Sequence, residues 1–127
     1  MSTDIIVGYP TETEEDFEAT LGLFDKHNFS FAYCFKFSPR HSTEAAKMTE
    51  LEQKIVEKRL DILLNKVKAL SVKVYEAQKG KEVSVLMETP FKGRTSENLW
   101  FKTKKAQKIG MIIKTAAREV NNTILLE

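Results

Sequence analysis

The residues from 29 to 37 alternate strictly between aromatic and small or polar side chains, and this run constrains the fold more than any other feature of the chain. The aromatic positions are Phe29, Phe31, Tyr33, Phe35 and Phe37. A period of two places all of them on one side of an extended segment. We therefore predict a β-strand here, ended by the turn-forming residues 38–42.

A shorter strand and a helix are predicted before this segment. Residues 4–7 form an apolar, β-branched run that is typical of a strand buried on both faces of a parallel sheet. Thr11 or Thr13 can cap a helix, whose apolar face includes Phe17 and Phe24 and whose predicted end is Asn28. Strand, helix and strand in this order form a βαβ unit. Two parallel strands are too few for a stable sheet of this type, so we expect further chain to complete it.

The rest of the chain changes character twice. Residues 50–78 are predicted to form one long helix with an apolar stripe, which we expect to pack on a core rather than to form a coiled-coil seam. Short strands follow, separated by Pro, Gly and Asn. They are predicted at 83–87, 99–101, 109–114 and 123–126. Closely spaced short strands favour a small closed β-barrel, because closure removes exposed edges.

The net charge of +2 hides a gradient along the chain. Residues 1–49 carry four basic and eight acidic side chains, whereas residues 77–127 carry ten basic and five acidic ones. From charge alone, the basic end indicates either a solvated face or a nucleic-acid surface, with neither favoured.

The sequence shows no export signal and no apolar run long enough to span a membrane. Cys34 is the only cysteine, which excludes an internal disulfide and fits a reducing compartment. We therefore expect a cytoplasmic protein without a membrane partner. Cys34 is predicted to be a small core residue, and His41 a solvated loop residue.

Three segments resemble motifs of the radical-SAM tRNA methylthiotransferases. Residues 3–17 read T-D-I-I-V-G-Y-P-T-E-T-E-E-D-F, with Tyr9 and Thr11 where the family usually has Phe and Gly. Residues 35–48 read F-K-F-S-P-R-H-S-T-E-A-A-K-M and resemble the family's F-K-Y-S-P-R-P-G-T-P-A-A-K-M. Residues 93–98 match the G-R-T-x-x-N of the TRAM domain that ends these enzymes.

The resemblance implies a fold and a division of the chain. Residues 1–49 would be an α/β fragment, the C-terminal part of a radical-SAM partial barrel. Residues 50–78 would be a connecting helix, and 79–127 a small OB-like TRAM β-barrel. The open edges of a two-stranded fragment invite pairing with other chains. We expect residues 1–49 to be loosely held or self-associated, and 79–127 to be well ordered.

The resemblance also implies the chemistry of the full-length parent. Such enzymes use S-adenosylmethionine and two 4Fe-4S clusters to add a methylthio group to isopentenyladenosine next to the tRNA anticodon. Relatives act on threonylcarbamoyladenosine or on a ribosomal-protein aspartate. A cluster needs three neighbouring cysteine thiolates. This chain has one cysteine, so we expect it to be inactive alone, with no catalytic residue, no metal and no cofactor of its own.

Several residues match the parent's cofactor site and several its RNA surface. Those assigned to the S-adenosylmethionine wall are Ile6, Gly8, Glu12, Phe35 and Arg40, the last with RNA phosphate as an alternative contact. Those assigned to RNA are Arg94, Asn98, Trp100, Lys102, Lys104, Lys105 and Lys108. Cations beside aromatic rings suit single-stranded RNA, because bases stack on the rings. Strand alternation makes one of Trp100 and Phe101 a core residue, and we expect Trp100 to be the exposed one.

The expected partners are a tRNA anticodon stem-loop and the missing N-terminal part of the same polypeptide. Two other interpretations remain. In the first, the chain is a free-standing RNA-binding or adaptor module. In the second, it is a metabolic α/β enzyme whose motif resemblance is accidental. The basic tail argues against the second.

Overall fold

The computed structural model describes residues 1–27 and 29–127, which divide into two compact units, 1–70 and 71–127. Helix α2 (Gln53–Glu76) runs through the division. Each unit has its own apolar core. The predicted end of the first helix at Asn28 lies outside the described residues.

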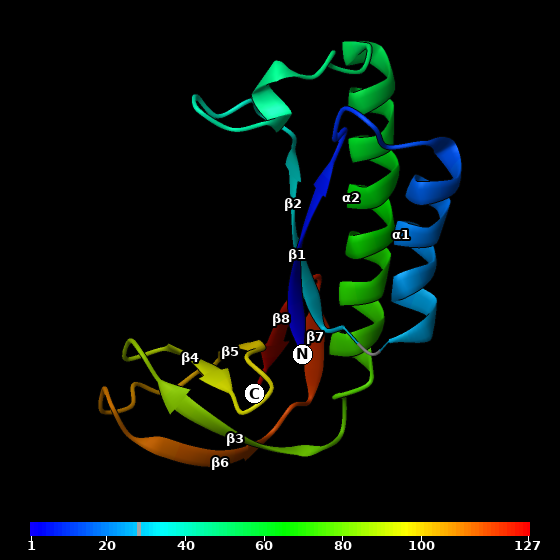
Figure 1. Ribbon diagram of the computed structural model, residues 1–127. Coiled ribbons are helices and arrows are strands. Elements are labelled where there is room, and N and C mark those ends of the chain that lie inside the picture. The colour runs from blue at the N-terminus through cyan, green and yellow to red at the C-terminus, as the bar shows by residue number, and fades with distance from the viewer. Residues whose placement is uncertain (28) are drawn as a thin grey trace. The chain divides into compact units, whose positions relative to one another are not determined.

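The first unit contains the predicted βαβ arrangement. Strand β1 (Ser2–Val7) and strand β2 (Phe31–Lys36) pair in parallel, with Ile6 opposite Phe35, and helix α1 (Glu14–Lys26) connects them (Figure 1). A short 3-10 helix, Ala45–Lys47, precedes α2. The order strand, helix, strand is therefore confirmed, and so is the long helix of the 50–78 segment.

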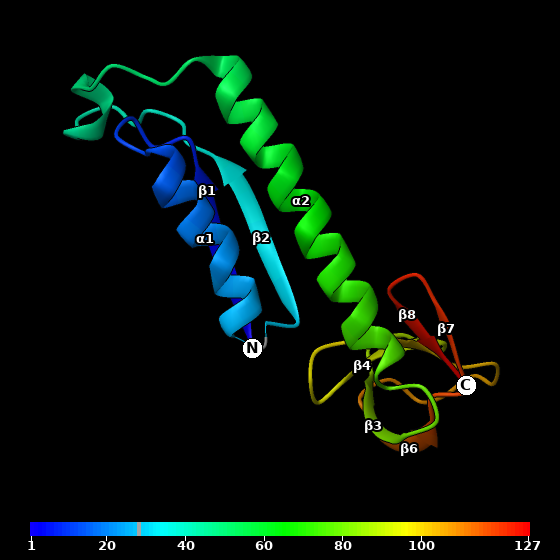
Figure 2. The ribbon, with the colours of Figure 1, turned by 90° about the vertical axis from the view of Figure 1, so that its right-hand side faces the viewer.

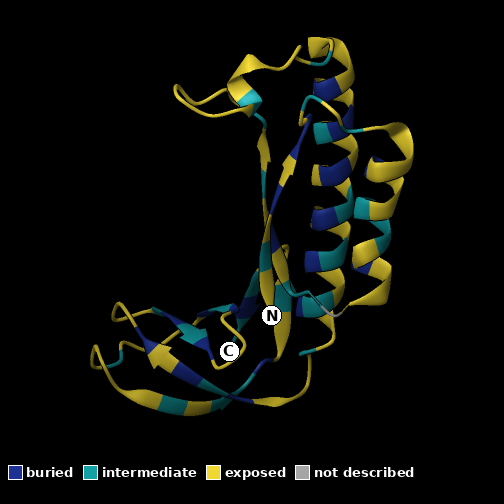
Figure 3. Ribbon diagram, viewed as in Figure 1, coloured by how far each residue is buried: buried dark blue, intermediate teal, exposed yellow. Residues whose placement is uncertain are grey.

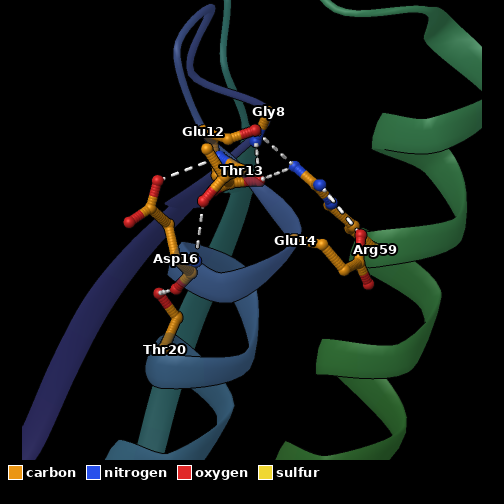
Figure 4. A network of polar contacts seen from close by, with 7 residues as sticks. All are labelled: Gly8, Glu12, Thr13, Glu14, Asp16, Thr20 and Arg59. Carbon is orange, nitrogen blue, oxygen red and sulfur yellow. Dashed lines mark hydrogen bonds and ion pairs between the residues drawn. The ribbon is translucent and has the colours of Figure 1, made fainter.

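Helix α1 begins with a capping box. The Asp16 amide donates to Thr13 Oγ1 at 3.1 Å, and the Thr13 amide donates to the Asp16 carboxylate at 2.9 Å (Figure 4). These bonds satisfy amides that have no partner within the helix. They also lower the pKa of Asp16, because they favour its charged form.

Only one face of the β1–β2 sheet is buried. Ile5, Val7 and Ala32 cluster with α1 and with the first part of α2, which lie on the same side of the strands (Figures 1 and 2). The opposite face is exposed and mostly aromatic, and Figure 3 shows exposed residues along both strands. Its residues and their exposed fractions are Ile6 58%, Tyr33 58%, Phe35 52% and Phe31 42%. The prediction that residues 4–7 are buried on both faces is thus wrong, because the described residues supply a helical layer on one side only.

The apolar stripe of α2 packs on the cores, as predicted. Val56, Leu63 and Val67 are each less than a tenth exposed, and Tyr75 near the end of the helix is 6% exposed. Spacings of seven, four and eight residues keep these side chains on one broad face of a helix.

The second unit contains a six-stranded sheet. Its strands are β3 (Glu82–Met87), β4 (Lys92–Thr95), β5 (Trp100–Lys102), β6 (Ile112–Ala116), β7 (Glu119–Asn121) and β8 (Ile124–Leu126). Their spatial order is β6-β3-β4-β5-β8-β7. Four of the six were predicted. Strand β4 was missed because a central glycine lowers strand propensity, and β7 because it is three residues long and runs into an asparagine turn.

The sheet is curled into a half-barrel. The end strands β6 and β7 do not pair with each other in the part of the chain that the structure describes. They are successive pieces of one segment, separated by Ala117 and Arg118. The Ala117 amide bonds Lys81 O on the β3 side, and the Arg118 amide bonds Leu126 O on the β8 side. The predicted small barrel is therefore confirmed in part, as a curled sheet whose two ends are joined by a bent segment.

Alternation along the strands defines the core of this unit. Val85, Met87, Phe101 and Leu125 point inward and are at most 1% exposed. Phe101 is thus a core residue, as predicted. The alternate positions of β4 and β5 point outward, and the candidate RNA-binding residues are among them.

Candidate functional site

The G-R-T-x-x-N segment begins with a glycine at a point of very close packing. A Cβ atom on Gly93 would lie 2.8 Å from Val85 Cγ1 and would overlap the Leu86 carbonyl oxygen on the neighbouring strand. Any other residue would separate β3 from β4. Gly93 therefore fixes where the outward side chains of β4 stand relative to β3.

The remaining motif residues form a turn that holds an arginine. Thr95 Oγ1 accepts from the Leu99 amide at 3.2 Å, and the Asn98 amide donates to Thr95 O at 2.9 Å. Asn98 has a φ of 66°, a left-handed conformation that asparagine tolerates. Its side-chain oxygen accepts from Arg94 Nη1 at 2.8 Å. The motif thus presents an arginine in a fixed position.

Arg94 and Lys92 lie over the ring of Trp100. The Arg94 guanidinium carbon is 3.9 Å and the Lys92 ammonium 3.8 Å from the ring centroid. Both cations come from alternate positions of β4, and Trp100 stands opposite Arg94 on β5. Arg94 Nε also lies 3.3 Å from Glu88 Oε1 in an ion pair, without a hydrogen bond between them. We call Lys92, Arg94 and Trp100 the tryptophan cluster.

Helix α2 anchors the strand that carries this tryptophan. The Trp100 amide donates to the hydroxyl of Tyr75 at 2.9 Å. Burial raises the pKa of Tyr75, and the hydrogen bond from Trp100 only partly offsets it. The hydroxyl therefore stays neutral and serves as an acceptor inside the core. The indole is partly exposed, while Phe101 is fully buried.

The structure brings together some of the basic residues assigned to RNA and separates others. Arg94, Asn98 and Trp100 form one bonded group, and Lys102 stands opposite Lys92 across β4 and β5. The other predicted cations are all exposed in the connection between β5 and β6, outside the tryptophan cluster. They are Lys104, Lys105 and Lys108.

Sequence reasoning missed Lys92, because it did not recognise β4 as a strand. The signal was present as K-x-R, since residues two apart share a face of a strand. With Lys92 and Lys102 included, the outward face of β4 and β5 carries three cations and an indole. Such a surface can attract phosphates, and the partly exposed indole can contact a base.

In the first unit, Ile6 and Phe35 are neighbours on the exposed aromatic face, directly opposite each other in the sheet. Phe31 and Tyr33 pack edge to face beside them, with ring centroids 4.7 Å apart. Apolar and aromatic side chains of this kind can form the wall of a ligand site.

Gly8 and Glu12 belong to a separate network of hydrogen bonds and ion pairs, which includes Arg59 of α2. Glu12 Oε1 accepts from the Gly8 amide at 3.1 Å and from Arg59 Nη1 at 2.6 Å (Figure 4). Arg59 also bonds Glu14 at 3.0 Å and the Glu12 carbonyl at 3.1 Å. The Glu12 and Arg59 side chains are 9% and 7% exposed. This buried network was not foreseen, because 47 residues separate its carboxylate from its guanidinium.

The residues matched to an S-adenosylmethionine wall therefore do not form one group. Ile6 and Phe35 fit the apolar part of such a wall. The Gly8 amide bonds Glu12 Oε1, and Oε1 also bonds Arg59, so these atoms already have partners within the chain. Arg40 is exposed in the loop after β2, where its carbonyl accepts from the Thr43 amide and hydroxyl.

The cysteine content does not fit an iron–sulfur cluster in this chain. Cys34, the only cysteine, alternates with the aromatic residues of β2, and burial raises the pKa of its thiol. Cluster iron is held by deprotonated thiolates, usually three or four of them. Residues 1–27 and 29–127 contain no group of three or more His, Cys, Asp or Glu that is arranged to hold a metal.

Known proteins resemble this chain over most of its length. A tRNA-2-methylthio-N(6)-dimethylallyladenosine synthase from Alkaliphilus oremlandii is 41% identical over 106 residues, which are 77% of this chain and 22% of that protein. Proteins of the same name from Bacillus subtilis and Aquifex aeolicus are 47% and 41% identical over 69% and 79% of this chain. No family model matches the chain.

The chain belongs to the family of these tRNA methylthiotransferases. It spans about a fifth of the length of the relatives it matches, 17–24% of each. The predicted resemblance to this family is thereby confirmed. Among the helices in the described residues, none has the length and apolarity needed to cross a membrane.

Proposed function

We propose that this chain is the C-terminal, RNA-binding part of a methylthiotransferase that modifies isopentenyladenosine next to the tRNA anticodon. The relatives are named for a methylthio modification of dimethylallyladenosine in tRNA. In the proposal, residues 71–127 form a TRAM-type domain that holds the anticodon stem-loop. The missing N-terminal part of the polypeptide supplies the cysteines for the two 4Fe-4S clusters.

The tryptophan cluster is the observation that carries the RNA-binding part of the proposal. It combines an indole with two cations held within 4 Å of its ring, on the outward face of a sheet in the basic end of the chain. The motif around Gly93 serves to place these groups. A rigid array of this kind binds a nucleic acid strand with a smaller entropic cost than flexible side chains would.

The exposed aromatic face of β1 and β2 supports the first unit's role in the parent enzyme. The proposal places Ile6 and Phe35 in the apolar wall against which S-adenosylmethionine lies. When bound, the cofactor would supply the radical and methyl chemistry. This chain's own contribution is to exclude water from that wall, while the Glu12–Arg59 network holds the adjoining turn.

A binding titration tests the proposal. A labelled anticodon stem-loop, with or without the isopentenyl group on its adenosine, is titrated with the chain at low and moderate salt. We expect saturable binding that weakens with salt, because phosphate contacts release counterions. Log affinity should fall against log salt concentration with a slope of roughly −0.7 to −0.9 per contact. Tighter binding of the isopentenylated form is expected if the modified base itself is held.

The variant that tests the tryptophan cluster carries both Lys92→Ala and Arg94→Ala. Its affinity for the stem-loop should fall. The slope of log affinity against log salt concentration should become shallower by the amount expected for about two phosphate contacts. The absence of wild-type binding at low salt would contradict an RNA-binding role for this part of the enzyme.

A further inference from the structure

A pocket of about 400 Å³ opens next to the tryptophan cluster, within the second unit. It is lined by the side chains of Phe91, Lys102, Lys104, Glu119 and Leu126, among others. A volume of this size lies in the range of ligand pockets. None of the motifs identified in the sequence includes Phe91 or Glu119.

Backbone bonds fix the walls of this pocket. The Thr103 amide donates to Phe91 O at 2.9 Å, which ties the turn before β4 to the end of β5. The Lys104 amide donates to Glu127 Oε2 at 3.1 Å, and the Glu127 amide donates to Lys102 O at 3.2 Å. The aromatic side of the pocket and its basic side are therefore held together.

The pocket continues the surface of the tryptophan cluster. Phe91 directly precedes Lys92, and Lys102 stands opposite Lys92 in the sheet. Trp100 and Lys102 share a face of β5 about 7 Å apart, two residues along a strand. Lys102 thus belongs both to the pocket lining and to the face of β5 that carries Trp100.

We propose that this pocket binds one unstacked base of the RNA, next to the nucleotide that contacts Trp100. The base stacks on Phe91, which is 48% exposed and so presents part of its ring. Lys102 and Lys104 face the phosphates on either side of that base. Single-stranded RNA is bound in this way elsewhere, by aromatic stacking together with cations that follow the backbone.

Glu119 gives the pocket a preference among bases. It makes no ion pair within the described part of the chain. A carboxylate accepts hydrogen bonds from exocyclic amino groups, such as N4 of cytosine, and repels the carbonyl oxygen that uracil has in the same place. Cytosine is therefore preferred to uracil at this position.

The inference rests on the proposed RNA-binding function, and the experiment separates the two. The chain is titrated with labelled heptamers of cytidine and of uridine at low salt, and with the anticodon stem-loop. Phe91→Ala and Phe91→Leu are compared with Leu64→Ala. Leu64 lies on α2 in the first unit and is similarly exposed, at 46%. Leucine keeps an apolar side chain at position 91 but has no ring face.

We expect both Phe91 variants to bind the cytidine heptamer about fivefold or more weakly than the wild type, and Leu64→Ala to bind it unchanged. Glu119→Ala should abolish the preference for cytidine. If the wild type binds RNA and the Phe91 variants bind it as well as Leu64→Ala does, the pocket inference alone is overturned. No wild-type binding to any of the three RNAs would overturn the proposed function and the inference with it.

Discussion

Arg59 Nη1 of α2 lies 2.6 Å from Glu12 Oε1, in the turn between β1 and α1. Both side chains are less than a tenth exposed, and the same oxygen accepts from the Gly8 amide. Burial disfavours the charged guanidinium, but hydrogen bonds to Glu14 and Glu12 outweigh it and raise the pKa of Arg59. The pair thereby fixes the turn after β1 against the long helix.

Breaking this pair from one side should destabilise the first unit strongly. Arg59→Met leaves the Glu12 carboxylate buried without its partner, which costs roughly 3–5 kcal/mol. Glu12→Gln should cost less, because Arg59 keeps its ion pair with Glu14. Urea unfolding followed by circular dichroism measures the loss. The double variant should recover part of it, because no uncompensated charge remains.

The exposed pair Lys66–Asp25 is the matched control. Its atoms are also 2.6 Å apart, but its side chains are 31% and 71% exposed. Asp25→Asn should therefore cost under about 1 kcal/mol. Equal losses of unfolding free energy at the buried and exposed pairs would show that the Glu12–Arg59 pair stabilises the first unit no more than a surface ion pair does.

Gly93→Ala and Gly22→Ala should change stability in opposite directions. An alanine Cβ at position 93 meets the backbone of Leu86, so β3 and β4 must separate and roughly 1–3 kcal/mol is lost. At position 22, inside α1, a Cβ meets nothing within 4 Å, and alanine should stabilise the helix by about 0.5–1 kcal/mol. Thermal unfolding of the two variants checks both signs. A stable Gly93→Ala protein would contradict the close packing.

Trp100 and Phe101 are neighbours with different roles. Phe101→Ala should cost about 3–5 kcal/mol, because it leaves a cavity in the core of the second unit. Trp100→Ala should unfold near the wild-type midpoint but bind the stem-loop more weakly. Chemical denaturation and RNA affinity, measured on both variants, separate the two effects. The reverse pattern would mean that the two faces of β5 were assigned wrongly.

The capping box should make α1 sensitive to pH. The backbone and side chain of Thr13 hold the pKa of Asp16 below its ordinary value of 3.8. A lowered folded-state pKa adds stability above the ordinary value, and this stability is lost as pH falls through the lowered one. The wild type should therefore be more stable than Asp16→Asn from pH 5 to 7, with a difference that shrinks below about pH 4. A difference that grows with acid would contradict the assignment.

Local patterns were sufficient to predict the elements of this fold. Alternation in 29–37 and the apolar run before Gly8 gave the parallel strands, and the spacing of apolar residues gave α2. Burial could not be predicted in the same way, because a period of two does not say which face meets a helix. The aromatic residues of β2 are exposed, while the small side chain of Ala32 allows the helices to pack closely.

The candidate sites were predicted only where they follow from a short motif. Arg94, Asn98 and Trp100 lie within seven residues, so a motif could place them together. Glu12 was assigned to the cofactor because the motif says nothing of Arg59, its partner in the fold. The Phe91 pocket is assembled from β5, β7, β8 and a turn, and no local pattern marks such a site.

The chain contains a single tryptophan, so its fluorescence reports directly on the proposed RNA surface. Titration with the anticodon stem-loop should quench the Trp100 emission in a saturable manner, with a midpoint that moves to higher RNA concentration as salt rises. A labelled stem-loop, followed by anisotropy in the same samples, should give the same midpoint. Saturable binding with unchanged tryptophan emission would place the RNA elsewhere on the chain and contradict the central claim.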